Sequence, residues 1–314
     1  MESIIRVENL VKRYKKTKVN AVDNISFLVE KGEFFAFLGP NGAGKTTTIS
    51  ILTTTLAKTS GTVRIAGYDL EKNPKQVRQN IGVIFQGASL DLNLTAEENV
   101  RLHASLYGMF AYRPFYAMMP KAYKKRVGEL SEMLRLGEEM FKPIRTFSGG
   151  MKRKLEIIRS LMHKPSILFL DEPTAGLDPI SRQNLWGYLT DVRNTEKTTV
   201  FLTTHYLEEA EDADHICIIN NGRVVARGTP AEVKKDLVEE YLVLDAENRA
   251  QLKQELTRQN LNFTEGDTIK VALGNGVTAQ QAIQSLKTPL SVLQIHTPTL
   301  EEAYLDIIDS DERT

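Results

Sequence analysis

A glycine-rich loop between an apolar strand and a helix is the clearest chemical feature of the sequence. Residues 39–47 read GPNGAGKTT, after the apolar run FFAFL and before the helical pattern TTTISILTTTL. Glycines let backbone N–H groups turn inward at a helix N-terminus, where phosphate groups bind. Lys45 can then reach the β- and γ-phosphates of a nucleotide, and the Thr46 hydroxyl can reach Mg²⁺. A glycine-rich turn with a solvated lysine is the structural alternative.

The second chemical feature is a pair of adjacent carboxylates after an apolar strand. The run SILFLDEPTAGLD, residues 166–178, places Asp171 at the strand end, where ligands of open α/β sheets bind. Asp171 can hold Mg²⁺ through water, and Glu172 can polarise an attacking water as a general base. An acid pair that caps the following turn is the alternative, and the presence of the glycine-rich loop makes it less favoured.

Two further polar residues end predicted strands. Gln86 ends IGVIF and can contact Mg²⁺ and the attacking water, whereas His205 follows VFLTT and can bond a γ-phosphate. A single glutamine or histidine at a strand end more often satisfies local backbone groups. A ligand role for either residue therefore depends on the two motifs described above.

The stretch FSGGMKRKLEIIRS, residues 147–160, predicts an amphipathic helix that begins at two glycines. Its first turn holds Lys152, Arg153 and Lys154, and cations oppose the helix dipole at this end. These cations raise the question of whether this helix start binds an anion, and from which molecule that anion would come. We expect most of the three cations to be a solvated charge run.

The sequence resembles ATP-binding-cassette (ABC) ATPases over about residues 4–235. The resemblance lies in the order and approximate spacing of GPNGAGKT, Gln86, FSGGM, ILFLDEP, GLD and TTH. The Ser-Gly-Gly motif is specific to that family among phosphate-loop proteins. The resemblance implies ATP and Mg²⁺ as ligands, Glu172 as general base, Gln86 beside the attacking water and His205 as γ-phosphate sensor. The implied nucleotide site comprises Tyr14 on adenine and Gly39, Asn41, Gly42, Gly44, Lys45, Thr46 and Thr47; the implied metal ligands are Thr46, Gln86 and Asp171. For Tyr14, a packed aromatic residue on a basic hairpin is the alternative.

The same resemblance implies a site shared between two chains. Ser148, Gly149 and Gly150 would contact the γ-phosphate held by the opposite subunit, and Asp178 would be the acid of the inter-subunit loop. Two ATP molecules would lie between two head-to-tail chains, either two copies or this chain and a close paralogue. Met151 stands where glutamine is commonest in the family, so the polar contact of a glutamine is lost while the Ser-Gly-Gly backbone is kept.

The elements that must position these residues form two parts. IGVIF, SILFL and TTVFLTT predict buried parallel strands, and ISFLV and FFAFL around the turn EKGE predict an antiparallel pair. ICIINNGRVVARG predicts a hairpin with a type I′ turn at Asn221-Gly222. We expect an α/β phosphate-loop ATPase core over residues 1–235, with a mostly parallel sheet, an antiparallel β subdomain and a helical subdomain inserted at about residues 90–162.

Residues 236–314 predict a small C-terminal α+β domain. IKVAL and SVLQI read as strands and VTAQQAIQSL as a helix. Thr229 and Pro230 begin a helix before this domain, and Thr299 with Glu302 forms a capping box for the closing one. The end HTPTLEEAYLDII resembles that of the daunorubicin-resistance-type branch of ABC ATPases, which pairs with ABC-2-type permeases; an amphipathic closing helix is the plainer alternative.

Composition narrows the function classes. Forty basic residues balance forty acidic ones, so no overall field recruits nucleic acid, and only KRYKKTK is a basic stretch. The single cysteine, Cys217, lies in an apolar run; we expect it in the core of a protein of the reducing cytosol. We recognise no signal peptide or membrane-spanning run, and expect a soluble chain whose membrane role requires a separate partner.

We therefore expect the ATP-hydrolysing motor of a membrane exporter, bound to a separate permease at the cytoplasmic face of the membrane, with no nucleic-acid partner. The alternative is a soluble ABC ATPase that acts on the ribosome or nucleic acid. It is less favoured for two reasons. ABC proteins that act in translation usually carry two cassettes on one chain, and this chain carries one. ABC proteins that act on chromosomes separate the two nucleotide motifs with a long coiled coil, which is absent here. No N-K-x-D motif supports a GTPase.

The segment MFAYRPFYAMMPKAYKK, residues 109–125, is rich in aromatic residues and methionine, and Pro114 and Pro120 prevent one uninterrupted helix. Two interpretations stay open. The segment packs within the helical subdomain, or part of it docks on the permease or the membrane surface, where such side chains and nearby lysines are suited to bind.

Overall fold

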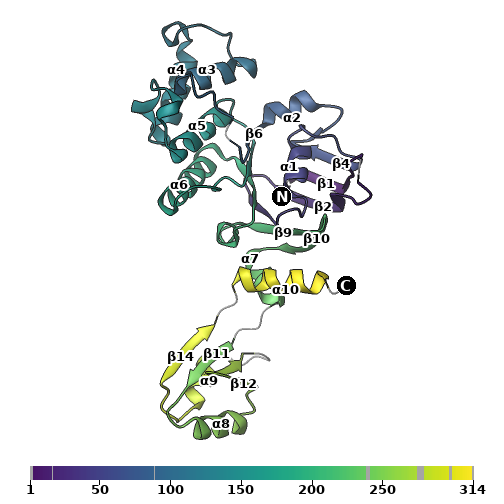
Figure 1. Cartoon of the computed structure of the whole chain (residues 1–314), viewed down its shortest axis with the longest axis vertical. Coiled ribbons are helices and arrows are strands. Elements are labelled where there is room, and N and C mark those ends of the chain that lie inside the picture. Colours follow the sequence, from purple (N-terminus) through teal and green to yellow (C-terminus); the bar gives the residue numbers. More distant parts are fainter. Residues whose placement is uncertain are drawn as a thin grey trace. The chain divides into compact units, whose positions relative to one another are not determined.

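The computed structural model describes residues 3–15, 17–87, 89–237, 241–273, 279–296 and 299–312. It divides into two units, Met1–Arg227 and Gly228–Thr314, which are described separately below. The division falls before the boundary expected at residue 235. The reason is that helix α7 (Pro230–Leu237) packs against α10 (Leu300–Glu312), which places α7 in the second unit (Figure 1).

The first unit is built on a six-stranded sheet with the order β10-β9-β3-β8-β7-β6. Five of its strands run parallel: β3 (Phe34–Leu38), β6 (Ile81–Ile84), β7 (Ile167–Asp171), β8 (Thr199–Thr204) and β9 (His215–Asn220). The buried parallel strands predicted from their continuous apolar runs are confirmed. The hairpin to β10 (Arg223–Gly228) is also confirmed, since Asn221 and Gly222 have φ of 46° and 79°, as a type I′ turn requires.

A second sheet, antiparallel, has the order β2-β1-β4-β5. Its strands are β1 (Ser3–Lys12), β2 (Val22–Glu30), β4 (Ser60–Ile65) and β5 (Tyr68–Asp69). The expected pairing of ISFLV with FFAFL is wrong, because β2 and β3 belong to different sheets. Strand β3 bonds to β8 on one side and β9 on the other, so neither of its edges is open to β2.

One hydrophobic core joins the two sheets and helix α1 (Lys45–Leu52). Phe27 of β2 packs against Phe37 of β3 and Phe201 of β8, with ring centroids 5.5 and 6.1 Å apart. Ile49 and Leu52 of α1 are fully buried in the same core. This packing holds the carboxyl ends of β3 and β7, which carry the glycine-rich loop and the carboxylate pair.

The helical region between β6 and β7 forms one end of the first unit (Figure 1). It contains α3 (Ala96–Leu106), α4 (Lys121–Met133), α5 (Gly149–Leu161) and the short 3₁₀ helices η1 (Tyr116–Met118), η2 (Gly137–Glu139) and η3 (Ile144–Thr146). A capping box of Thr95 and Glu98 begins α3. Helix α2 (Pro74–Asn80) precedes β6, whereas α6 (Pro179–Glu196) and η4 (Leu207–Ala210) flank β8 in the chain.

Residues 109–125 are interrupted as their prolines predict, with only η1 before α4 begins at Lys121. Part of this segment packs within the helical subdomain, and part of it is exposed. Phe110 and Tyr116 pack edge-on against the buried Tyr123. Phe115 and Tyr112 are instead 67% and 61% exposed, so the segment presents aromatic surface to its surroundings.

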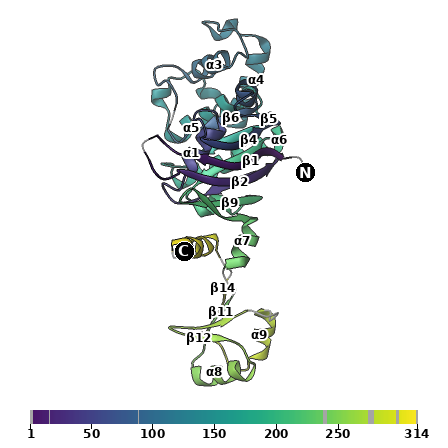
Figure 2. The same ribbon diagram turned by 90° about the vertical axis from the view of Figure 1, so that its right-hand side faces the viewer.

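The second unit contains a four-stranded antiparallel sheet with the order β12-β13-β11-β14. The strands are β11 (Tyr241–Asp245), β12 (Phe263–Glu265), β13 (Ile269–Ala272) and β14 (Val292–His296), and the sheet packs against α8 (Arg249–Arg258) and α9 (Ala279–Ser285) through the core that they share (Figure 2). The strands predicted at IKVAL and SVLQI are confirmed, and so are the N-cap at Thr229 and the capping box at Thr299. Of VTAQQAIQSL, the part up to residue 278 lies outside the described residues.

No helix in the described ranges is long and apolar enough to cross a membrane.

Candidate active site

The glycine-rich loop presents the N-terminus of α1 at the end of β3. This helix has no acidic residue in its first turn and no side-chain cap, so its first N–H groups suit an anion. Gly44 has φ of 111°, and a Cβ there would lie 2.5 Å from the carbonyl oxygen of Ala21. A Cβ at Gly39 would lie 2.3 Å from the carbonyl oxygen of Ile219. Only glycine fits at these two positions.

Lys45, the first residue of α1, turns its ammonium into this loop. The side chain is buried, and Nζ donates to the carbonyl oxygens of Gly39 at 2.7 Å and Pro40 at 3.1 Å. Burial lowers the pKa of Lys45, and the nearby Glu172 and Asp171 carboxylates oppose that shift. The ammonium is thus held where it can exchange two carbonyl oxygens for phosphate oxygens.

Glu172 is the point at which the predicted catalytic residues converge. Its Oε1 lies 3.2 Å from Nδ1 of His205 and 3.8 Å from Nζ of Lys45. Its Oε2 accepts a hydrogen bond of 3.0 Å from Nε2 of Gln86. Glu172 has φ of 46°, in the left-handed region, and its N–H donates to the carbonyl oxygen of Thr203. This constrained backbone directs the carboxylate toward groups from three other chain segments.

Asp171 lies beside this cluster at the end of β7. It is 2% exposed, and its Oδ1 accepts a hydrogen bond from the Thr203 hydroxyl. Burial raises the pKa of Asp171, and the Thr203 bond opposes that rise. Among the described residues, no group of three or more His, Cys, Asp or Glu forms a metal site by itself. A metal here would therefore need ligands from a bound nucleotide, as Mg²⁺ commonly has.

Tyr14 and Thr47 lie together at the outer side of the loop. The Tyr14 hydroxyl is 3.3 Å from the Thr47 hydroxyl, and Nζ of Lys12 is 5.3 Å from the centre of the Tyr14 ring. The Tyr14 side chain is 42% exposed, which leaves ring surface for another flat group. Asn41, Gly42 and Thr46 are exposed on the same loop and helix start.

Ser148 and Asp178 belong to a second cluster. Each caps a helix: Oγ of Ser148 accepts from the N–H of Met151 in α5, and Oδ1 of Asp178 accepts from the N–H of Ser181 in α6. A Cβ on Gly150 would lie 3.1 Å from the Ser181 hydroxyl, so the two helix starts are close together. Between the described residues, no hydrogen bond or ion pair joins Ser148, Gly149, Gly150 or Asp178 to the Lys45 and Glu172 cluster. The predicted site residues therefore form two separate clusters.

Most of the three cations Lys152, Arg153 and Lys154 were expected to be solvated, and Arg153 is an exception. Its side chain is buried, and Nη1 donates to the carbonyl oxygen of Phe85 at 2.8 Å and to Glu156 at 2.8 Å. Its Nε donates to the carbonyl oxygen of Pro173. Arg153 thus ties α5 to the residue before Gln86 and the residue after Glu172. An Arg and a Glu three residues apart on an otherwise apolar helix face was the signal for it.

A family model described as ABC transporter matches residues 22–175. The chain is similar to the daunorubicin/doxorubicin resistance ATP-binding protein DrrA of Streptomyces peucetius, with 40% identity over 81% of this chain and 75% of that protein. It is similar to the daunorubicin resistance ATP-binding protein DrrA3 of Streptomyces coeruleorubidus, with 34% identity over 99% and 98%. The Nod factor export ATP-binding protein I of Ralstonia nicotianae is 39% identical over 76% of this chain and 72% of its own length.

Solved structures with the same fold are also ATP-binding cassettes. An ATP-binding subunit of an ABC transporter superposes with a TM-score of 0.64 and 31% identity, over 74% of this chain and 93% of that one. A dimeric cassette in a post-hydrolysis state, bound to ADP and Pi, has a TM-score of 0.62 and 26% identity, over 72% and 98%.

Proposed function

Since this chain belongs to the ATP-binding proteins of ABC transporters, we propose that it drives an exporter as a head-to-tail dimer attached to a separate permease. Family membership makes the chain an ATPase and the motor of a transporter. The observation that carries the assignment of residues is the convergence of Lys45, His205 and Gln86 on the Glu172 carboxylate.

Glu172 is the group suited to take a proton from the attacking water. As the water oxygen bonds to the γ-phosphorus, the bond from that phosphorus to the β–γ bridging oxygen breaks, and ADP and phosphate result. The proton passes to the Glu172 carboxylate. His205, 3.2 Å from that carboxylate, is placed to bond the γ-phosphate, and Lys45 is placed to stabilise charge on the β- and γ-oxygens.

The residues near the carboxylate fit Mg²⁺ bound with the nucleotide. Asp171, the exposed Thr46 hydroxyl and Gln86 all offer oxygen, which this hard cation prefers. Gln86 donates to Glu172 through its NH₂, which leaves its carbonyl oxygen for a metal. When bound, the cation would supply charge stabilisation to the phosphate oxygens.

The two separate clusters support a shared nucleotide site in a dimer. The N-termini of α5 and α6, with Ser148 and Asp178, have no function for the nucleotide of their own chain in this geometry. Placed opposite the Lys45 loop of a second chain, the start of α5 would meet a γ-phosphate with its N–H groups and the Ser148 hydroxyl. A γ-phosphate from the second chain would explain why the start of α5 carries cations and has no acidic residue in its first turn.

Export is supported by the names of the relatives, whereas the separate permease and the cytoplasmic face of the membrane are parts of the proposal itself. The relatives' names attribute drug resistance and Nod factor export to those proteins. Nothing in the sequence or the site favours the alternative action on ribosomes or nucleic acid. The docking of residues 109–125 on a membrane partner stays a prediction, and exposed Tyr112, Phe115 and Met118 are the side chains available for it.

Cysteine crosslinking tests the head-to-tail arrangement. Cys217 is the only native cysteine and is buried, so an Asn41→Cys, Ser148→Cys pair can be read without background. With ATP bound, we expect a disulfide between two chains and none within one. A single Asn41→Cys or Ser148→Cys chain is the control. An ATP-bound dimer that forms no such crosslink would defeat this arrangement.

Mixed dimers provide a functional test of the same arrangement. With Lys45→Ala in one chain and Ser148→Arg in the other, both lesions fall on one composite site, and the second site stays whole. We expect this dimer to retain one nucleotide, in its intact composite site. With both lesions in the same chain and a native partner, both composite sites are damaged, and we expect none. Equal nucleotide retention by the two dimers would contradict a shared site.

A further inference from the structure

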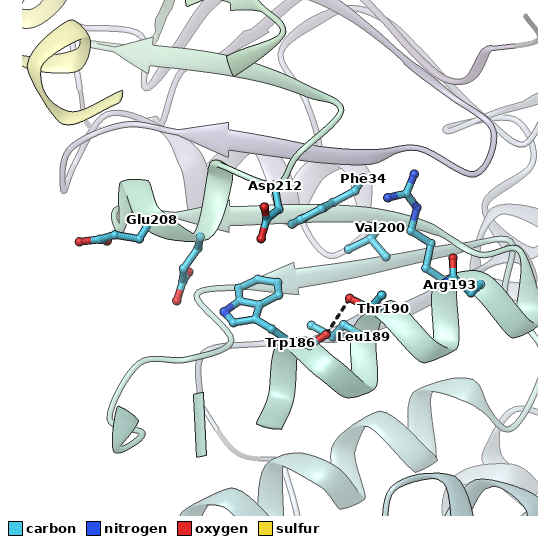
Figure 3. A pocket seen from close by; sticks show the side chains of 10 residues that line it. Phe34, Trp186, Leu189, Thr190, Arg193, Val200, Glu208 and Asp212 are labelled. Carbon is cyan, nitrogen blue, oxygen red and sulfur yellow. Dashed lines mark hydrogen bonds between the residues drawn. The ribbon is translucent and has the colours of Figure 1, made fainter. Parts of the chain in front are cut away.

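A cavity of about 340 Å³ lies on the first unit away from the nucleotide residues, between α6 and η4 (Figure 3). Two aromatic rings line it, Phe34 at the start of β3 and Trp186 on α6, with centroids 5.8 Å apart. Leu189 and Val200 add apolar surface. None of the residues assigned to ATP or Mg²⁺ lines this cavity.

The charge around this cavity is negative. Asp212 points toward Phe34 and Trp186, and Glu208 lies at the rim with its carboxylate directed outward (Figure 3). Neither carboxylate makes a hydrogen bond or an ion pair with another described residue. The one cation of the lining, Arg193, is already paired with Asp214 at 2.6 Å and bonded to the carbonyl oxygen of Gly32.

An aromatic cavity with unpaired carboxylates selects against anions and in favour of cations. The face of an indole or phenyl ring attracts an ammonium group electrostatically, and Trp gives the strongest such attraction. Asp212 adds a full negative charge next to those rings; because this residue is exposed, solvent screens part of its attraction, and the rings add theirs to it. The apolar walls suit a hydrocarbon or aromatic group on the same ligand.

We propose that this cavity binds a small organic cation, in which a protonated amine or quaternary ammonium is joined to an apolar or aromatic group. The ammonium lies between the Trp186 ring and the Asp212 carboxylate, with Glu208 strengthening the negative field at the entrance. Glu209, which also lines the cavity, accepts hydrogen bonds from the hydroxyls of Thr204 and Thr174. The ligand would therefore rest against the segment that holds the residue before His205.

Trp186 is the only tryptophan of the chain, so its fluorescence reports directly on this cavity. The full-length protein, with excess ADP to occupy the nucleotide site, is titrated with benzyltrimethylammonium. Benzyl alcohol and phenylacetate serve as neutral and anionic counterparts with the same ring. Calorimetry gives the affinity in parallel. We expect a saturable change in Trp186 emission with the cation, and affinity at least about tenfold weaker for the two counterparts.

The Glu208→Gln, Asp212→Asn double variant keeps the shape of the lining and removes its two unpaired charges. We expect the preference for the cation to fall to about the level of the neutral ligand. Asp191→Asn, an exposed change on α6 outside the cavity, is the matched control and should bind as the native chain does. No saturable signal with the cation, equal affinity for all three ligands, or unchanged preference in the double variant would each overturn the proposal.

Discussion

At the scale of single residues, the site follows from motifs whose members are close in sequence. Lys45 and Thr46 were predictable because glycines before a helix start indicate a phosphate-binding loop. Asp171 and Glu172 were predictable because no structural requirement explains two adjacent acids at the end of a strand. The bond from Gln86 to Glu172 spans a long sequence separation, so no local pattern could show it. Arg153 was missed for a similar reason: its partners, Phe85 and Pro173, lie on other segments.

Glu172→Gln tests the general base. The amide keeps the size of the side chain but cannot accept the proton, so we expect turnover to fall about 10²- to 10⁴-fold, or roughly 3 to 5 kcal/mol in the barrier. ATP binding should persist, because Lys45 and the loop N–H groups are unchanged, and the variant should accumulate as an ATP-bound dimer. Steady-state hydrolysis and nucleotide-binding titration check these outcomes. Hydrolysis at the native rate would show that another group is the base.

At the scale of elements, the sequence patterns predicted strands and caps better than pairing. The apolar runs of β6, β7 and β8 are each long enough to identify a buried strand, and Asn-Gly identifies the hairpin after β9. The pairing partner of a strand is decided by competition among strands that can lie far away in the sequence. FFAFL therefore lies between β8 and β9 instead of beside the strand that precedes it. Strands β11 and β12 and helix α8 were not predicted.

A stack of three rings at the ends of helices α3 and α5 carries a pH-sensitive group; His103 and His163 are half-buried, and Tyr107 is exposed. The ring of Tyr107 lies 4.3 Å from that of His103 and 4.9 Å from that of His163. Burial, with smaller contributions from the nearby Arg159 and His163, lowers the pKa of His103 to about 3 from 6.5. Nδ1 of His103 is buried and has no partner in the described part of the chain.

This stack predicts a loss of stability in mild acid. Because the folded pKa of His103 is depressed, the unfolded chain takes up the proton first, as the pH falls below about 6.5. The stability contributed by neutral His103 is full above that pH, and about 2 kcal/mol of it is lost by pH 5. Urea denaturation at pH 7.5 and pH 5 measures the difference. His103→Phe keeps a ring in the stack and should show a shallower pH dependence; an equal dependence in both proteins would contradict the assignment to His103.

At the scale of the whole chain, every residue assigned to ATP precedes Arg227, and the second unit has its own core. Leu242, Leu244, Leu252 and Val271 are fully buried within that core, which contains no residue of the first unit. The composition change near residue 235 predicted a second domain but not its beginning. Helix α7 is assigned to the second unit only by its packing against α10, which lies at the other end of that unit in the sequence.

Truncation at two positions tests this division. A chain that ends at Gly228 keeps both sheets and every nucleotide residue of the first unit. We therefore expect its ATP affinity to lie within about a factor of two of the native value, a change in binding free energy of less than about 0.5 kcal/mol.

A chain that ends at residue 236 also keeps most of α7 but removes α10. Val233, which is 4% exposed in the full chain, would then lose part of its cover, and we expect this longer chain to aggregate more readily. Nucleotide titration and light scattering on both chains, with circular dichroism to establish folding, make the comparison. A folded chain ending at Gly228 that no longer binds ATP would show that the second unit is part of the nucleotide site. Equal solubility of the two chains would show that α7 does not depend on α10.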